Sequence, residues 1–312
     1  MAFYNVENLF DTIDDPGVKD EEFTPEAKVP WTKERYKTKL KNISRALSTF
    51  DNGKLPVMIG LCEVENKNVI KDLLSVEPLN QPKYSFIHKD SPDERGIDVA
   101  LLFDPHFFKP VYAEFIALPF SFEPTEKTRD ILYVKGTIDT DTLHVFVNHW
   151  TSRWGGQQET EEFRVHTAGV MATVFDSLKK AVKHPNFIMM GDFNDNPDNI
   201  SLAETLNAQV VDDDPENDEL YNLSYQMFLD GEGTLYWKSW DMFDQFIVSG
   251  NLLHTDDGLQ LSPAHQFIHK PDWILFEDNN GVKRPSRTKG SNAYYGGFSD
   301  HLPVYIYLGK KK

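Results

Sequence analysis

The sequence predicts a mixed α/β protein whose helices and strands are interleaved along the chain. Two long segments carry apolar residues at the spacing of one helix face, and many short apolar runs have the length and bounding turns of buried strands. The chain has 312 residues, of which 40% are hydrophobic, so it contains enough apolar material for a sizeable core. We find no internal repeat and no stretch that resembles a flexible linker.

The first half is expected to open with a strand at residues 2–6 and to continue with an amphipathic helix at residues 33–50. Thr32 is a suitable N-cap for this helix. Apolar runs then predict strands at residues 55–62, 97–103, 132–138 and 143–148.

The second half is expected to contain a long helix at residues 159–180, followed by strands at 186–191, 243–249, 273–276 and 304–308. Two stretches are predicted to be long loops. Residues 212–219 are acidic, and residues 281–297 are basic and aromatic within an acidic chain.

The formal net charge is −17 at pH 7, so the surface as a whole repels polyanions. A phosphate or nucleic-acid ligand would need local basic residues or a bound cation in order to approach. This charge argues against a protein that coats nucleic acid electrostatically.

Cys62 is the only cysteine, which excludes an intramolecular disulfide and a zinc cluster built from cysteines. No run of about 18 apolar residues is present, so we expect no transmembrane segment. Because a strand is predicted from Ala2 onward, we expect that Met1 replaces a leader that has been removed. A removed leader would allow export, and the sequence does not identify the compartment. A monomer is the default expectation, with no stable protein partner indicated.

Polar residues follow the apolar run 187–190. In extended chain, Asp192 and Asn194 lie on the same side, because residues two apart share a face. The carboxylate would align a water molecule and the amide would hold a phosphate oxygen. The alternative is an ordinary turn rich in Asp and Asn.

Other polar residues are also predicted at strand ends. Asp300 and His301 precede the last strand. Asp300 is suited to binding a metal and His301 to stabilising phosphoryl oxygens, although such a pair is more often structural. Glu63 ends a buried strand and suits a hard cation such as Mg²⁺, with Glu65 as its rival. His149 and Asn5 end two further strands. Together these positions suggest one site at one edge of a sheet assembly.

Six motifs follow one another along the chain: Tyr4-Asn5, Cys62-Glu63, Asn148-His149, Gly191-Asp192-Phe193-Asn194, Asp244 and Ser299-Asp300-His301. In this order they resemble the endonuclease/exonuclease/phosphatase superfamily, which includes deoxyribonuclease I. The resemblance implies one domain over residues 1–312, folded as a four-layered α/β/β/α sandwich with two central, mainly antiparallel mixed sheets. It also implies a metal-dependent hydrolase of phosphate esters that uses Mg²⁺, with Mn²⁺ as the alternative.

Carried over by position, the resemblance assigns three residues to the metal site: Asn5, Glu63 and Asp300. Asn5 is expected to act through water. The resemblance assigns five residues to catalysis: His149, Asp192, Asn194, Asp244 and His301.

Within this scheme Asp192 orients or deprotonates the attacking water, while Asn194 and His149 hold the scissile phosphate. His301 stabilises the developing charge, and Asp244 orients His301. Asp241 is a rival to Asp244, which we prefer because it directly precedes an apolar run.

Substrate class does not follow from the resemblance, because this chain has Cys62-Glu63 where family nucleases commonly have Gln-Glu. The first hypothesis is an endonuclease or phosphodiesterase acting on nucleic acid. The second hypothesis is an enzyme that acts on a small or lipid-linked phosphate ester. The third hypothesis is a catalytically inactive scaffold. Five residues are expected to bind substrate: Arg153, Lys283, Arg284, Arg287 and Tyr294.

Overall fold

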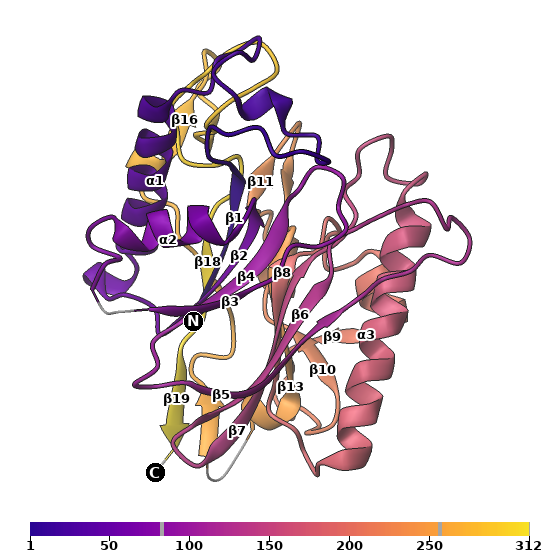
Figure 1. Ribbon diagram of the computed structural model, residues 1–312. Helices are drawn as coiled ribbons and strands as arrows, with labels where there is room; N and C mark the ends of the chain where they lie inside the picture. Colours follow the sequence, from indigo (N-terminus) through magenta and orange to yellow (C-terminus); the bar gives the residue numbers. More distant parts are fainter. Residues whose placement is uncertain (82–83, 255–257, 312) are drawn as a thin grey trace.

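The computed structural model describes residues 1–81, 84–254 and 258–311. Two mixed sheets face each other at its centre, and helices cover their outer faces (Figure 1). None of the helices in these described ranges is long and apolar enough to span a membrane.

The first sheet has six strands in the order β15-β18-β1-β2-β4-β3. Their bounds are β1 Ala2–Leu9, β2 Met58–Val64, β3 Ser85–His88, β4 Asp98–Phe103, β15 Phe267–Ile268 and β18 Val304–Tyr305. Strands β1 and β2 are parallel, and the other pairs in this sheet are antiparallel.

The second sheet has seven strands in the order β5-β6-β7-β8-β13-β10-β9. Their bounds are β5 Lys109–Ile116, β6 Ile131–Ile138, β7 Asp141–His149, β8 Phe187–Asp192, β9 Ala208–Val210, β10 Leu220–Asn222 and β13 Asp244–Ser249. The pairs β7–β8 and β9–β10 are parallel.

The described residues also form three two-stranded ribbons, four α-helices and several short 3-10 or π-helical segments. The ribbons are β11 Leu235–Tyr236 with β12 Trp240–Asp241, β14 Gly258–Leu261 with β19 Leu308–Lys311, and β16 Leu275–Glu277 with β17 Lys283–Pro285. The helices are α1 Lys33–Leu47, α2 Lys67–Ser75, α3 Glu161–Ala181 and α4 Tyr225–Leu229.

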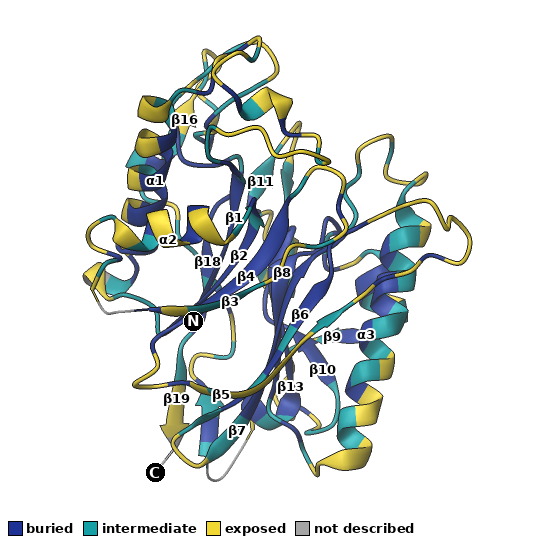
Figure 2. Cartoon of the chain, in the orientation of Figure 1, coloured by how far each residue is buried: buried dark blue, intermediate teal, exposed yellow. Residues whose placement is uncertain are grey.

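Successive side chains along a strand point to opposite faces of the sheet, and this alternation creates separate apolar layers. Tyr4 of β1 packs beneath α1 and α2, whereas Phe3 points into the core between the sheets. On the far side, Phe175 of α3 packs against Phe187 of the second sheet. Figure 2 shows buried strands between helices whose outer faces are exposed. The expected four-layered α/β/β/α sandwich with two mixed sheets is therefore confirmed.

Several predicted boundaries were wrong near the site. The first strand continues past Asn5 to Leu9, and the second continues past Cys62 to Val64. Both strands carry an irregularity in register at these positions. The polar residues at these positions were interpreted as the ends of the two strands. Instead they lie where the strand pairing is irregular, and irregularities such as β-bulges redirect side chains without ending the pairing.

Other boundaries differ for local reasons. Helix α1 ends at Leu47 rather than at residue 50, because the Ser48 backbone N–H bonds to the Arg45 carbonyl and closes the last turn. The predicted strand 304–308 is divided between β18 and β19. The predicted loop 281–297 was wrong in part, because it contains β17.

Candidate active site

Three adjacent strands of the second sheet bring polar residues together at one edge. In the sheet register His149 of β7 lies opposite Asp192 of β8, and Asp192 lies opposite Asp244 of β13. A Cβ atom at Gly191 would lie only 2.5 Å from the Asn148 carbonyl oxygen, so glycine permits the close approach of β7 and β8 here.

The first sheet adds Asn5 and Glu63 to the same edge. The Asn5 side-chain amide donates to Asp192 Oδ2 at 2.9 Å and to Glu63 Oε1 at 3.3 Å, so it joins the two sheets. Glu63 has a φ of 60°, in the left-handed region that side chains seldom adopt. Such backbone strain is concentrated at functional sites, and here it accompanies the bulge that carries Glu63.

His301 lies between two carboxylates. Its Nδ1 is 2.7 Å from Asp244 Oδ2, and its Nε2 is 3.7 Å from Asp192 Oδ2. The rival Asp241 instead accepts a hydrogen bond from the Asn196 side chain. The structure therefore brings Asp244, and not Asp241, to His301.

His301 and Asp192 shift each other's pKa values, and the charge of Asp244 acts on both. Burial by itself would lower the pKa of His301, but Asp244 and Asp192 outweigh it and hold that pKa well above its ordinary value. Burial raises the pKa of Asp192, while His301 opposes the rise. The imidazole is thus held as a cation between two acids.

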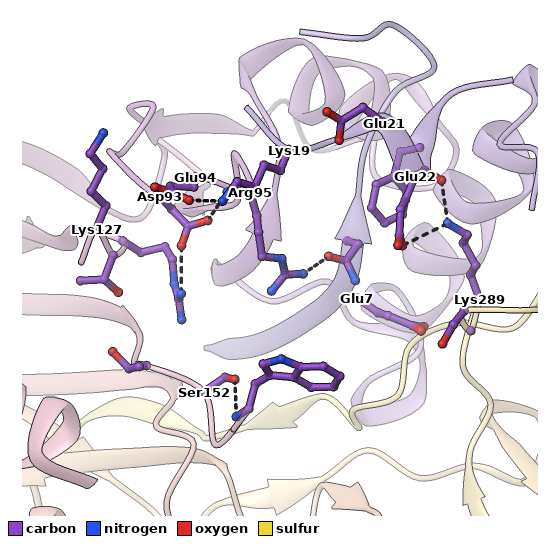
Figure 3. Close-up of a pocket in the computed structure, with 18 of the residues that line it drawn as sticks. Glu7, Lys19, Glu21, Glu22, Asp93, Glu94, Arg95, Lys127, Ser152 and Lys289 are labelled. Atoms are coloured by element: carbon purple, nitrogen blue, oxygen red, sulfur yellow. Dashed lines mark hydrogen bonds and ion pairs between the residues drawn. The ribbon is translucent and has the colours of Figure 1, made fainter. Parts of the chain in front are cut away.

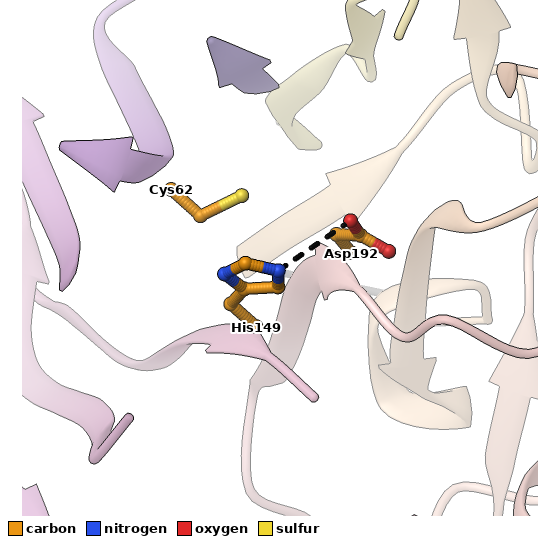
Figure 4. Close-up of side chains that lie close together, drawn as sticks. All are labelled: Cys62, His149 and Asp192. Atoms are coloured by element: carbon orange, nitrogen blue, oxygen red, sulfur yellow. Dashed lines mark ion pairs between the residues drawn. The ribbon is translucent and has the colours of Figure 1, made fainter. Parts of the chain in front are cut away.

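His149 is buried against the same carboxylate in a different environment. Its Nε2 lies 3.8 Å from Asp192 Oδ2 and 3.9 Å from Glu63 Oε1, and Figure 4 shows it beside Asp192 and the Cys62 thiol. Burial, reinforced by Arg129, Arg95 and His301, holds the pKa of His149 well below its ordinary value.

Cys62 contributes packing rather than nucleophilic chemistry. Its side chain belongs to the apolar core between the sheets, and burial raises the pKa of the thiol well above its ordinary value. A thiol that stays protonated is a poor nucleophile.

Asn194 is fixed next to Asp192 by the turn that follows β8. Its backbone N–H donates to Asp192 Oδ1 at 3.0 Å, and its side-chain amide donates to the Trp150 carbonyl at 3.0 Å. The backbone φ of Asn194 is 51°. The turn predicted from the sequence is present, and it places the Asn194 backbone N–H against the Asp192 carboxylate.

Asp300 is connected to a buried ionic network on the side of the first sheet. Arg287 donates to Asp300 Oδ2 at 3.3 Å and to Glu7 Oε1 at 3.1 Å. Glu7 Oε2 lies 4.0 Å from the Nζ of Lys39, a fully buried lysine of α1 that also donates to the Phe298 carbonyl at 2.8 Å. Burial raises the pKa of Glu7 and lowers that of Lys39.

The residues expected to bind substrate do not gather at this edge as a group. Lys283 pairs with Asp272 at 2.7 Å, and Arg284 lies over the Phe276 ring on the β16–β17 ribbon. Tyr294 packs against Trp31 and beneath Arg35. Of these five residues, Arg287 is the one that lines the large cleft beside the site.

Arg153 forms a structural network. Its guanidinium donates to the Asn194 carbonyl at 2.8 Å, to Asp195 Oδ1 at 2.9 Å and to Asn199 Oδ1 at 2.6 Å. It therefore supports the turn that carries Asn194. A direct role in binding substrate stays a prediction.

A cleft of about 990 Å³ adjoins these residues (Figure 3). Glu7 and Asn8 line this cleft. The Asn8 backbone N–H donates to Glu63 Oε2 at 2.8 Å, which connects the cleft wall to the site. Sequence reasoning did not identify Arg95 or Trp154 in its wall. The signal for Trp154 was a tryptophan followed by two glycines in the loop after His149.

The residues present fit a hard divalent cation. Glu63 and Asp300 carry carboxylate oxygens, the donors that Mg²⁺ prefers, and their assignment to the metal stays a prediction. Asn5 is less suited to direct ligation, because its side-chain oxygen accepts the Glu7 N–H at 3.0 Å while its NH₂ group holds Glu63. At this edge two groups of side chains have ligand atoms within 4.8 Å of one another: Cys62 with His149 and Asp192, and Asp192 with Asp244 and His301. The described residues therefore include a candidate acidic and histidine metal site.

Comparisons with known proteins agree with this geometry. A model described as the Endonuclease/Exonuclease/phosphatase family matches residues 1–310. No curated protein matches this chain.

Similar solved structures include the mannosyl-6-phosphatase Bt3783 of Bacteroides thetaiotaomicron, with a TM-score of 0.60 and 15% identity over 99% of this chain and 98% of that one. The human nocturnin catalytic domain with bound sulfate has a TM-score of 0.56 and 18% identity over 98% and 93% of the two chains. D. rerio TDP2 complexed with a single-strand DNA product has a TM-score of 0.51 and 16% identity over 81% and 86%. At these identities the similarity is one of fold.

Proposed function

The chain belongs to the endonuclease/exonuclease/phosphatase family, whose members are metal-dependent hydrolases of ester bonds, and we propose that its own substrate is a small phosphate ester. The observation that carries the choice of substrate is the charge of the cleft. Its wall contains six acidic and six basic residues, so it has no net positive charge to attract a long polyanion.

The basic residues of the cleft are also largely neutralised by neighbours. Ion pairs join Lys19 to Glu94, Arg129 to Asp93 and Arg287 to Glu7. Lys289 lies 3.7 Å from Glu22. A polynucleotide would have to break several of these pairs in order to gain phosphate contacts, whereas a single phosphate group needs only the catalytic edge.

In this proposal Glu63 and Asp300 hold the divalent cation, which offsets the negative charge of the phosphoryl group when bound. Asp192 accepts a hydrogen bond from the attacking water and orients it toward phosphorus. His149 and Asn194 donate hydrogen bonds to phosphoryl oxygens. The cationic His301, held by Asp244, stabilises the charge that develops during attack.

Nucleic acid is the second candidate substrate. The observation in its favour is the fold shared with the TDP2 structure that contains a single-strand DNA product. Both candidates use the same catalytic residues, so they differ in the cleft and in the charge of the substrate.

A substrate panel distinguishes the two candidates. The protein is incubated with bis(p-nitrophenyl) phosphate, p-nitrophenyl phosphate, supercoiled DNA and single-stranded RNA, each with Mg²⁺, with Mn²⁺ and with EDTA. We expect metal-dependent turnover of a small ester and little cleavage of either polymer. Efficient nicking of DNA or cleavage of RNA that is lost in His301→Ala would favour the nuclease instead.

A further inference from the structure

The cleft beside the candidate site continues from the proposed phosphate position into a wall made by several separate segments. Figure 3 shows Glu7, Arg95 and Ser152 contributed to it from different parts of the chain. Arg287 connects the wall directly to Asp300. Asn8 of the same wall donates to Glu63, so an alcohol group attached to a phosphate at the catalytic edge would extend toward this cleft.

We infer that Trp154 forms a subsite in this cleft for a hydroxyl-rich ring, such as a sugar, in the alcohol part of the phosphate ester. The inference rests on the proposed function and adds the class of substrate. It follows from the exposure of Trp154, the polarity of the surrounding wall and the absence of a second free aromatic face.

Trp154 is 92% exposed although it lines a cleft. Its backbone N–H donates to Ser152 Oγ at 3.0 Å, which fixes the loop that leaves β7. Among the described residues its indole stacks on no other ring and carries no cation over its face. A large apolar side chain left open beside a functional site indicates a surface that a ligand covers.

The wall of the same cleft is rich in polar side chains. The hydroxyls of Thr128 and Thr151 and the Nε of Arg129 have no hydrogen-bond partner among the residues that the structure describes. All three residues line the cleft, and Thr128 and Arg129 are more than nine-tenths buried. These three atoms are themselves buried, so the polar groups open to a ligand are those of cleft residues such as Glu126, Lys127 and Ser152, and the hydroxyls of a sugar can both donate to and accept from such groups.

A nucleobase fits this arrangement less well, because it is apolar on both faces. The other aromatic residues of the cleft are already engaged. Trp31 is fully buried, Phe23 stacks on Phe10 at 4.3 Å, and Phe163 packs against Phe120 at 4.8 Å. Trp154 therefore offers an apolar face in a cleft lined by polar residues, which suits a ring with apolar C–H groups on one face and hydroxyls around its edge.

The test compares three phosphate esters in the full-length protein with Mg²⁺: a hexose 6-phosphate, glycerol phosphate and adenosine monophosphate. We expect wild type to prefer the hexose ester. Trp154→Ala should lower the ratio of kcat/KM for the hexose ester to that for glycerol phosphate about tenfold, mainly through KM, and Trp154→Phe should retain most of the ratio. Trp237→Ala is the matched control, because Trp237 is 74% exposed and does not line the cleft.

A binding experiment separates this inference from the proposed function. Saturation-transfer NMR with the free hexose should show contact with the wild-type protein and with Trp237→Ala, and a loss of contact in Trp154→Ala. If wild type hydrolyses no phosphate ester but this binding pattern holds, the subsite stands and the proposed function fails.

Two outcomes would overturn the subsite while leaving the phosphoesterase in place. One is an unchanged kcat/KM ratio in Trp154→Ala together with unchanged NMR contact. The other is a loss in Trp154→Ala that is larger for adenosine monophosphate than for the hexose ester, since the indole would then serve a base.

Discussion

His149 and His301 occupy the same buried edge, and each lies within 4 Å of Asp192, yet their surroundings shift their pKa values in opposite directions. His301 has the Asp244 carboxylate on its Nδ1 at 2.7 Å. The Nδ1 of His149 has no hydrogen-bond partner among the described residues, and its pKa is lowered by burial and further by the cationic Arg129, Arg95 and His301.

This difference shows that the partner of Nδ1 determines whether each of these buried imidazoles is a cation or a neutral ring. A carboxylate on that nitrogen stabilises an imidazolium, whereas desolvation without such a partner leaves a neutral ring. One phosphate group placed against both histidines would therefore meet a cation on one side and a neutral hydrogen-bond donor on the other.

The largest effect is expected from removing the cationic member. His301→Ala should lower kcat for the preferred ester by about three to four orders of magnitude, because both charge stabilisation and proton transfer are lost. Steady-state kinetics with Mg²⁺ measure the change, and circular dichroism checks the fold. Activity within tenfold of wild type would remove His301 from the mechanism.

Asp244→Asn tests whether Asp244 acts through His301. The variant should lose about a hundredfold or more in kcat alone, because the amide cannot hold the imidazolium. In the His301→Ala background the same change should have almost no further effect. Additive losses in the double variant would mean that Asp244 acts independently.

His149→Gln should have a smaller effect than His301→Ala. Glutamine retains a hydrogen-bond donor but not the ring geometry, so we expect a loss of about ten- to a hundredfold in kcat/KM. The two variants are compared on the same ester and at the same metal concentration. A loss greater than that of His301→Ala would reverse the proposed roles.

Lys39→Met extends the comparison to the buried ionic network behind Asp300. The substitution leaves Glu7 without its lysine partner and should lower the free energy of unfolding by about 3 kcal/mol. Urea denaturation measures this change. Lys37→Met, at an exposed position of the same helix, is the control and should stay within about 0.5 kcal/mol of wild type.

His144 provides a buried histidine on β7 away from the site. Burial lowers its pKa to about 4. Below the ordinary value of about 6.5 the unfolded chain binds a proton that the folded chain does not, so stability should fall as the pH drops from about 6.5 toward 4. By pH 5 this residue accounts for about 2 kcal/mol of the loss.

The pH dependence is measured by urea denaturation between pH 7 and pH 5. His144→Gln removes the titrating group while keeping a polar side chain toward Tyr133, whose hydroxyl lies 2.8 Å from His144 Nδ1. Its stability should therefore decline less over this range than that of wild type. Parallel curves for the two proteins would exclude His144 as a contributor.

The positions of the central strands were largely predictable from local patterns, whereas the four-layered sandwich was expected from the resemblance of the six motifs to a known family. Apolar runs marked the central strands, and polar residues such as His149, Asp192 and Asp244 followed or preceded them directly. Parallel and antiparallel pairing then brought these strand ends to one edge.

The ionic network and the cleft were not predictable in the same way. Lys39 is buried by contacts with Thr288 and Phe298, which are far away in sequence, so no local pattern distinguishes it from the other lysines of its helix. Arg95, Thr128 and Trp154 come from separate loops that meet only in the folded chain. Loop conformation depends on such long-range contacts, which leave no periodic signal in the sequence.

The most direct test of the account is hydrolysis of the preferred small ester with Mg²⁺ in water labelled with a heavy oxygen isotope, using wild type and Asp192→Asn. We predict that the label appears in the released phosphate, because water attacks phosphorus, and that Asp192→Asn loses about a thousandfold or more in rate. Label in the alcohol product, or a near-normal rate in Asp192→Asn, would contradict the proposed mechanism.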